Sequence, residues 1–304
     1  MVRLEELNLN NTSVSGDIAI FAKFVRLTTL DFGATSVFGN IGSVAALVNL
    51  TFLHFGGTLV DGKLLSVSGL TQLQGLCFFY LSISGDIACV AGLVNLKREL
   101  VLAGTGVSGD ISSVAGLADL KVLWLEKTNV SGGIESVAGL THLTELCLIN
   151  TRVTGDIASV AGLVHLTGLR MGGCDGVTGD IGNLCPLVKL TRIDLGFTHV
   201  SGDIKSVAGM VRLVELSLSQ SGVSGDISSL MGLVNLSLVA LTNCTGISGH
   251  MKSFAGLKCL TGLRLRMTSI TAPHDCPTNE DGHYIYMDAG ACEELRVWLD
   301  GSAP

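Results

Sequence analysis

The stretch Thr151-Arg-Val-Thr-Gly-Asp-Ile-Ala-Ser-Val-Ala-Gly-Leu-Val-His-Leu-Thr-Gly-Leu169 is repeated, with small changes, along most of this chain. When the copies are aligned on one leucine, the steps between them are 23 residues, apart from three of 24. A fixed period of this length is typical of a solenoid, in which each copy buries its apolar side only against its neighbours. The aligned residues are Leu4, Leu27, Leu50, Leu73, Leu96, Leu120, Leu143, Leu166, Leu190, Leu213, Leu236 and Leu260.

The consensus of the copies, LTxLxLxxTxVSGDIxSVAGLVx, resembles the leucine-rich repeat family over roughly residues 4–270. Within that family the sequence looks most like the plant-type pattern LxxLxLxxNxLSGxIP, which Leu143–Ile157 follows position by position. Two features differ: Thr usually replaces the Asn, and the Pro is missing. A hydroxyl satisfies fewer backbone groups than an amide, so we expect a less rigid turn after each strand.

The resemblance implies an α/β solenoid, a right-handed coil of about twelve repeats with a concave parallel β-sheet. We expect each LxLxx segment to form one strand of that sheet. The VSGDI segment is predicted to turn, with its Gly in a conformation that a Cβ would forbid and its Ile inside. The SVAGLVxL segment is too short and too rich in Gly for a long helix, so we expect one helical or 3-10 turn on the convex side.

The repeat pattern predicts a solenoid over residues 1–271 and a different C-terminal segment over 272–304. That segment begins as a turn-rich loop and ends in a predicted capping helix with Asp288 as its N-cap. No capping element precedes Leu4, so the N-terminal edge is predicted to be open. Such an edge would dock on a partner or a second copy, or continue a longer array.

The composition and charge of the chain disfavour several classes of function. A formal net charge of −7 disfavours a nucleic-acid groove, which needs a basic surface. The apolar runs are too short to span a membrane, so a soluble protein without membrane insertion is expected. Nine cysteines without pairing spacing favour free thiols and a reducing, intracellular compartment. No targeting segment is visible, and the sequence leaves the compartment open.

The residues on either side of the second leucine of each LxxLxL segment should point out of the solenoid, onto the concave sheet surface. These positions change at every repeat, whereas the scaffold letters hardly change. An aromatic group in the first half is of a kind that anchors interfaces. A largely basic group lies in the second half. The candidate partner-binding residues are Phe52, His54, Phe79, Trp124, Glu145, Arg170, Arg192, Asp194, Arg264 and Arg266.

Other chemistry is weaker in the sequence. The Asp of VSGDI supplies one carboxylate per copy, which suits an N-cap better than a calcium ladder. His274, Cys276, His283 and Cys292 match no zinc spacing, and a Cys276–Cys292 disulfide is an alternative in a secreted protein. No catalytic motif is present. Cys77 and His54, on neighbouring strands, are the single nucleophile-like pair, and no third group to orient them is evident.

The sequence therefore predicts a protein-interaction or scaffold module that binds a protein partner and needs no metal or cofactor. One alternative is the ligand-recognition ectodomain of a receptor-like protein. A second is an ice- or surface-binding protein, suggested by the Thr column. Those Thr residues occupy the family's Asn positions, which the resemblance places inside the turn, so a flat exposed row is not expected.

Overall fold

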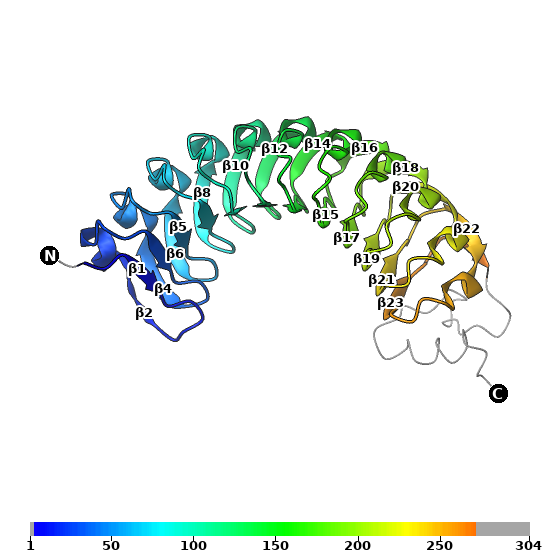
Figure 1. The fold of residues 1–304 in the computed structure, drawn as a ribbon, viewed down its shortest axis with the longest axis horizontal. Coiled ribbons are helices and arrows are strands. Elements are labelled where there is room, and N and C mark those ends of the chain that lie inside the picture. Colours follow the sequence, from blue (N-terminus) through cyan, green and yellow to red (C-terminus); the bar gives the residue numbers. More distant parts are fainter. Residues whose placement is uncertain (1–2, 272–304) are drawn as a thin grey trace. The chain divides into compact units, whose positions relative to one another are not determined.

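The computed structural model describes residues 3–271 and contains two compact units, Met1–Thr154 and Gly155–Pro304. Each unit is a stack of coils that follow one another in chain order (Figure 1). Every coil contains an LxL strand, a second strand from the VSGD segment and, in most coils, a 3-10 turn. The solenoid that the period predicts is confirmed. The predicted C-terminal loop and capping helix lie outside the described residues.

In the first unit the LxL strands form one parallel sheet, here called the LxL sheet. Its leucines lie in register, since Leu30 pairs with Leu53 and Leu53 with Leu76. Its strands are β1 (Glu6–Asn8), β3 (Thr29–Asp31), β5 (Phe52–His54), β7 (Gly75–Cys77), β9 (Glu99–Val101), β11 (Val122–Trp124) and β13 (Glu145–Cys147).

The second unit continues the same design. Its LxL strands also pair in parallel and in register, as Ile193 with Leu216 shows. These strands are β15 (Gly168–Arg170), β17 (Arg192–Asp194), β19 (Glu215–Ser217), β21 (Leu238–Ala240) and β23 (Gly262–Arg264).

The VSGD segments form a second parallel sheet, so the prediction of a simple turn there was wrong. Its strands in the first unit are β2 (Ser15–Asp17), β4 (Ser36–Asn40), β6 (Leu59–Lys63), β8 (Ser82–Asp86), β10 (Gly106–Asp110) and β12 (Asn129–Gly133), and β14 (Arg152–Asp156) contains the boundary between the units. Those of the second unit are β16 (Gly176–Asp180), β18 (His199–Asp203), β20 (Gly222–Asp226), β22 (Gly246–His250) and β24 (Ser269–Thr271).

Glycine is needed in these second strands for two reasons. Gly109 has a φ of +105°, a region that side chains with a Cβ rarely adopt. A Cβ on Gly109 would also lie 2.2 Å from Oδ1 of Asp86 in the preceding coil. The Gly and Asp of VSGDI therefore depend on each other across neighbouring coils, which a turn within one coil would not require.

A 3-10 turn follows most of the second strands, as predicted. The turns in the first unit are η1 (Ile18–Lys23), η2 (Ile41–Val44), η3 (Leu64–Val67), η4 (Ile87–Val90), η5 (Ile111–Val114) and η6 (Ile134–Val137). Those of the second are η7 (Ile157–Val160), η8 (Ile181–Leu184), η9 (Ile204–Val207), η10 (Ile227–Leu230) and η11 (Met251–Phe254). Asp110 and its counterparts cap them, because a side-chain oxygen of Asp110 accepts the backbone N–H of Ser112.

The Thr column lies inside the turn after each LxL strand. Thr35 is 7% exposed, and its hydroxyl donates to the carbonyl of Phe32 at 2.6 Å. Thr128 and Thr198 make the same bond to Leu125 and Leu195. Between Thr35 and Thr198 the Thr residues of this column are buried, while Thr12 is exposed and Thr268 is partly exposed, so the described hydroxyls form no continuous exposed row.

The residue directly before each position of this column, whether that position is Thr or a replacement such as Leu81 or Ser221, has a left-handed backbone. Ala34, Tyr80, Lys127 and Gln220 have φ values between 53° and 57°, and none of them is a glycine. This conformation costs a residue with a Cβ roughly 1–2 kcal/mol. The stacking of the coils must therefore impose it, since nothing in these residue types favours it.

The core of each coil is made of the repeated Leu, Ile and Val side chains, almost all of them fully buried. In the first unit three phenylalanines continue from coil to coil: the rings of Phe32 and Phe55 stack at 6.0 Å, and those of Phe55 and Phe78 at 6.4 Å. Among residues 3–271, no helix has the length and apolar character needed to cross a membrane.

Candidate functional site

The surface of the LxL sheet that faces away from the core, here called the LxL face, carries the predicted site residues. Along each strand the leucine points inward and its two neighbours point outward, as Leu53 between Phe52 and His54 shows. All ten predicted residues lie on or directly after LxL strands. Five belong to the first unit and five to the second, so the two groups are described separately.

In the first unit the structure brings the predicted aromatic residues together. The ring of His54 lies 6.2 Å from that of Phe52 and 5.7 Å from that of Phe79. Phe79 and Trp124 both pack against a small cluster formed by Cys77, Val101 and Ala103. These three residues point away from the core but are no more than 6% exposed, because aromatic side chains cover them. We call this group, with Val122, the apolar patch.

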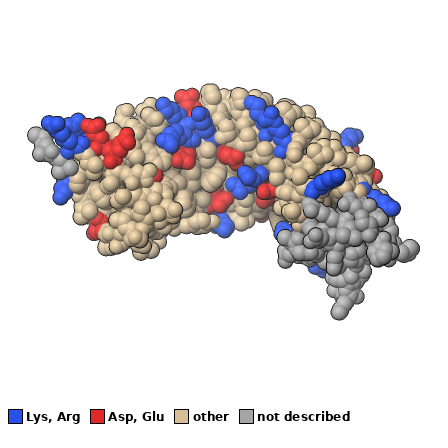
Figure 2. Space-filling view, turned by 60° about the horizontal axis from the view of Figure 1, so that its bottom comes forward, with Lys and Arg blue, Asp and Glu red and all other residues tan. Residues whose placement is uncertain are grey.

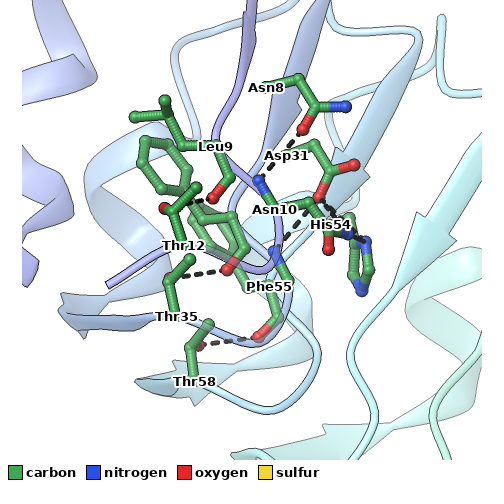
Figure 3. A network of polar contacts seen from close by, with 11 residues as sticks. Asn8, Leu9, Asn10, Thr12, Asp31, Thr35, His54, Phe55 and Thr58 are labelled. Atoms are coloured by element: carbon green, nitrogen blue, oxygen red, sulfur yellow. Dashed lines mark hydrogen bonds and ion pairs between the residues drawn. The ribbon is translucent and has the colours of Figure 1, made fainter. Parts of the chain in front are cut away.

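A polar network adjoins the patch at its N-terminal side (Figure 3). Oδ1 of Asp31 is 3.0 Å from Nδ1 of His54 and accepts a hydrogen bond from the Asn10 amide at 3.1 Å. It also accepts the backbone N–H of Gly33. Because a carboxylate only accepts, this contact places the His54 proton on Nδ1. Nε2 of His54 is buried and has no hydrogen-bond partner among the described residues.

Asp31 is the orienting group that sequence reasoning missed. Asp31, His54 and Cys77 pair across three neighbouring strands, β3, β5 and β7, in the same row. The signal was available, since the three residues are each 23 positions apart and therefore share one column of the repeat. The row resembles a catalytic acid–base–nucleophile series in its order only.

The chemistry of Cys77 argues against a nucleophile. Burial, together with the nearby carboxylates of Glu99 and Asp31, raises the pKa of its thiol to about 12. A catalytic cysteine needs its pKa lowered so that the thiolate forms near neutral pH. Cys77 is therefore protonated at pH 7 and serves as an apolar part of the patch.

The other described cysteines are free thiols as well: Cys89, Cys147, Cys174, Cys185, Cys244 and Cys259. Buried Cys147 donates its S–H to Oε2 of Glu126 at 2.8 Å, and Cys244 donates to the carbonyl of Leu218. Within residues 3–271 no group of three or more His, Cys, Asp or Glu side chains could hold a metal ion. His274, Cys276, His283 and Cys292, whose spacing matches no zinc site, lie outside the described residues.

In the second unit the charged residues do not form one group. Arg170 pairs with Asp194 across β15 and β17, and Arg192 with Glu215 across β17 and β19. Nε of Arg192 lies 3.5 Å from the Glu215 carboxylate. Arg264 and Arg266 are exposed at β23, separated from these residues by strand β21. The predicted basic region is therefore two smaller regions.

The space-filling view shows basic and acidic side chains in small groups, with uncharged surface between them (Figure 2). The exposed residue Phe197 was not predicted as a functional residue. With His199 and Gln220 it lines a shallow depression of about 480 Å³ where the LxL strands of the second unit connect to the second strands. The left-handed backbone of Phe197 could not be predicted from its residue type.

Several solved structures share the fold of this chain. A TDR receptor matches with a TM-score of 0.75 and 24% identity, over 88% of this chain and 48% of that one. An internalin from Listeria monocytogenes matches with a TM-score of 0.66 and 26% identity, over 88% of this chain and 76% of that one. The leucine-rich-repeat ectodomain of the Arabidopsis thaliana receptor kinase GASSHO1/SCHENGEN3 matches with a TM-score of 0.66 and 22% identity, over 89% of this chain and 39% of that one.

The chain thus has the leucine-rich-repeat solenoid fold, and it spans about half the length of the TDR receptor chain. The Arabidopsis ectodomain was solved in complex with Casparian strip integrity factor 2. No protein-family model matches the sequence, and no curated protein does.

Proposed function

We propose that this chain is a protein-binding module that recognises a protein partner through its LxL faces. The observation that carries the proposal is the contrast between constant and variable positions on the same strands. The inward position of these strands is almost always a fully buried leucine, as in Leu53, Leu123 and Leu216, whereas the outward positions range from Trp124 to Arg192. Variable aromatic and Arg side chains on a rigid sheet are suited to an interface.

The leucine-rich-repeat neighbours support the same class of function. A receptor ectodomain and an internalin share the fold, and the ectodomain was solved with its bound factor. Fold alone does not name a ligand, so the partner must be read from the LxL faces. We also propose that the repeat belongs to the plant-type subclass, on the strength of the Ser-Gly-Asp-Ile segment, and that binding involves no catalysis or cofactor.

The test begins with affinity capture from the native source and identification of the captured protein by mass spectrometry. Its dissociation constant is then measured against charge reversals on the LxL face, Arg192→Glu and Glu145→Lys. Matched controls reverse exposed charges elsewhere in the same units, Arg212→Glu and Glu135→Lys. We expect about tenfold weaker binding for a face variant that contacts the partner and no change for the controls. Equal affinity for all four variants would refute the proposal.

The receptor-ectodomain alternative makes a different prediction. A leader, a spanning segment or a kinase domain in the full-length gene would favour it. The described cysteines are relevant as well, because all seven are free thiols, whereas an oxidising compartment favours disulfides.

A further inference from the structure

The apolar patch of the first unit lies at the centre of a regular grid of outward-facing residues. Val122 pairs with Glu99 on one side and Glu145 on the other, so it lies between two carboxylates in one row. Trp124 occupies the next row, between Val101 and Cys147. The grid therefore places aromatic and aliphatic groups within one strand spacing, about 4.8 Å, of acidic groups.

The patch consists of apolar side chains that pack against one another outside the main core. Cys77, Val101 and Ala103 are 6%, 3% and 2% exposed, and Phe79, Val122 and Trp124 pack over them. Phe79, Val122 and Trp124 are themselves partly exposed to solvent. An exposed apolar surface on a folded protein, bordered by polar groups, marks a site of interaction.

Charge decides what kind of partner fits this surface. Within residues 3–154, the outward-facing positions on and directly after the LxL strands include acidic residues but no Lys or Arg. The carboxylates are Glu6, Asp31, Glu99, Glu126 and Glu145. Glu99 pairs with Val122 of the patch across β9 and β11, which places it directly beside the patch. A neutral or acidic partner segment would desolvate the half-buried carboxylate of Glu99 without bringing a compensating positive charge.

The chain's own cations show the geometry that such a partner would use. The Arg98 guanidinium lies 4.6 Å from the centre of the Phe52 ring, and Lys127 Nζ lies 5.8 Å from that of Tyr80. Phe52 is an outward-facing residue of β5 and so belongs to the grid, and Tyr80 follows β7 at the border of the grid. Cations stack favourably on aromatic faces, and more so when the pair is partly desolvated.

We propose, building on the proposed function, that the LxL face of the first unit binds an extended segment of the partner protein that carries Arg or Lys beside an apolar residue. The apolar residue contacts the surface formed by Phe79, Val122 and Trp124. The basic side chain lies over an aromatic ring and between the carboxylates of Glu99 and Glu145. An acidic segment is excluded by the same carboxylates.

The test uses the full chain as bait for a phage library of random twelve-residue peptides. The selected peptides are expected to be rich in Arg or Lys next to an apolar residue. Their dissociation constants are then measured by fluorescence polarisation with the double variant Glu99→Gln/Glu145→Gln. We expect about tenfold weaker binding and a smaller dependence of affinity on salt, since two charges are removed and shape is kept. Glu135→Gln, an exposed acidic residue on η6, is the matched control and should change nothing.

The outcomes separate this inference from the proposed function. Neutral or acidic selected peptides, no selectable peptide, or an equal effect of the control would overturn the inference. If the peptides lose affinity only with Arg192→Glu on the second unit, the proposed function stands and the inference fails. If no variant on the LxL face of either unit changes the affinity, both fail.

Discussion

The two units of this chain share one frame and carry different surfaces. In both, the LxL leucines are buried and Asp residues cap 3-10 turns. On the LxL face the first unit presents an apolar patch with carboxylates, whereas the second presents arginines paired with acidic residues, as in Arg192 and Glu215. The comparison shows that the repeat keeps the buried frame and the variable surface on separate positions of the same strand.

The largest expected effect tests the shared frame. Leu146→Ala in the first unit and Leu216→Ala in the second should each lower the free energy of unfolding by about 2–5 kcal/mol, because each removes a buried side chain. Urea denaturation followed by circular dichroism measures both. A cost below about 1 kcal/mol in one unit would show that the two cores are not equivalent.

The next effect tests the difference between the faces. Trp124→Ala should cost about 1–3 kcal/mol of stability, since it uncovers the cluster formed by Cys77, Val101 and Ala103. The sequence predicts that Trp124 faces outward and gives no sign that it covers this cluster. Arg192→Ala, at an exposed and partly paired position, should stay within about 1 kcal/mol. Equal losses in urea denaturation would remove the distinction between a packed face and a solvated one.

A smaller effect tests the backbone of the turns. Ala34→Gly and Gln220→Gly should raise the free energy of unfolding by about 0.5–1 kcal/mol, because Gly relieves a left-handed strain that exceeds its cost in chain entropy. Thermal denaturation can measure both variants. Destabilisation by either one would mean that the side chain makes a contact that outweighs the strain.

The smallest effect concerns the caps and pH. Backbone and side-chain hydrogen bonds from Ser112 lower the pKa of Asp110, and those from Ser228 lower that of Asp226. A carboxyl whose pKa is lower in the folded state stabilises the fold above its unfolded pKa of roughly 3.9, and this stabilisation is lost as pH falls through the folded pKa.

Asp110→Asn should therefore reduce the pH dependence of the melting temperature in the acid range, and Asp226→Asn should do the same. Gly133, which stands at the corresponding cap without a carboxylate, shows that the turn forms without that charge. Unchanged acid melting curves for both variants would contradict the capping role.

Much of the frame could be predicted because period and residue type determine it. The LxL strands, the 3-10 turns, the Asp caps and the buried Thr column all follow from letters that repeat. The second sheet could not be predicted from one copy. Its Gly109 is required by Asp86 of the preceding coil, and this contact between coils leaves no trace within a single repeat.

The site was predictable in part, for the same physical reason. The outward columns identified Phe52, His54 and Trp124, since alternation along a strand determines direction. The sequence did not show that Trp124 covers Val101, that Asp31 holds His54, or that Arg264 lies apart from Arg192. These depend on which side chains bend over their neighbours and on how many strands separate them.

Site-specific photocrosslinking tests the central claim, that the LxL faces contact the partner, most directly. A photoreactive amino acid is placed at Glu145, on the LxL face of the first unit, and in a second variant at Glu135, on the exposed surface of η6 in the same unit. After irradiation with the captured partner, the account predicts a covalent adduct from position 145 and none from position 135. An adduct from position 135 alone would contradict it.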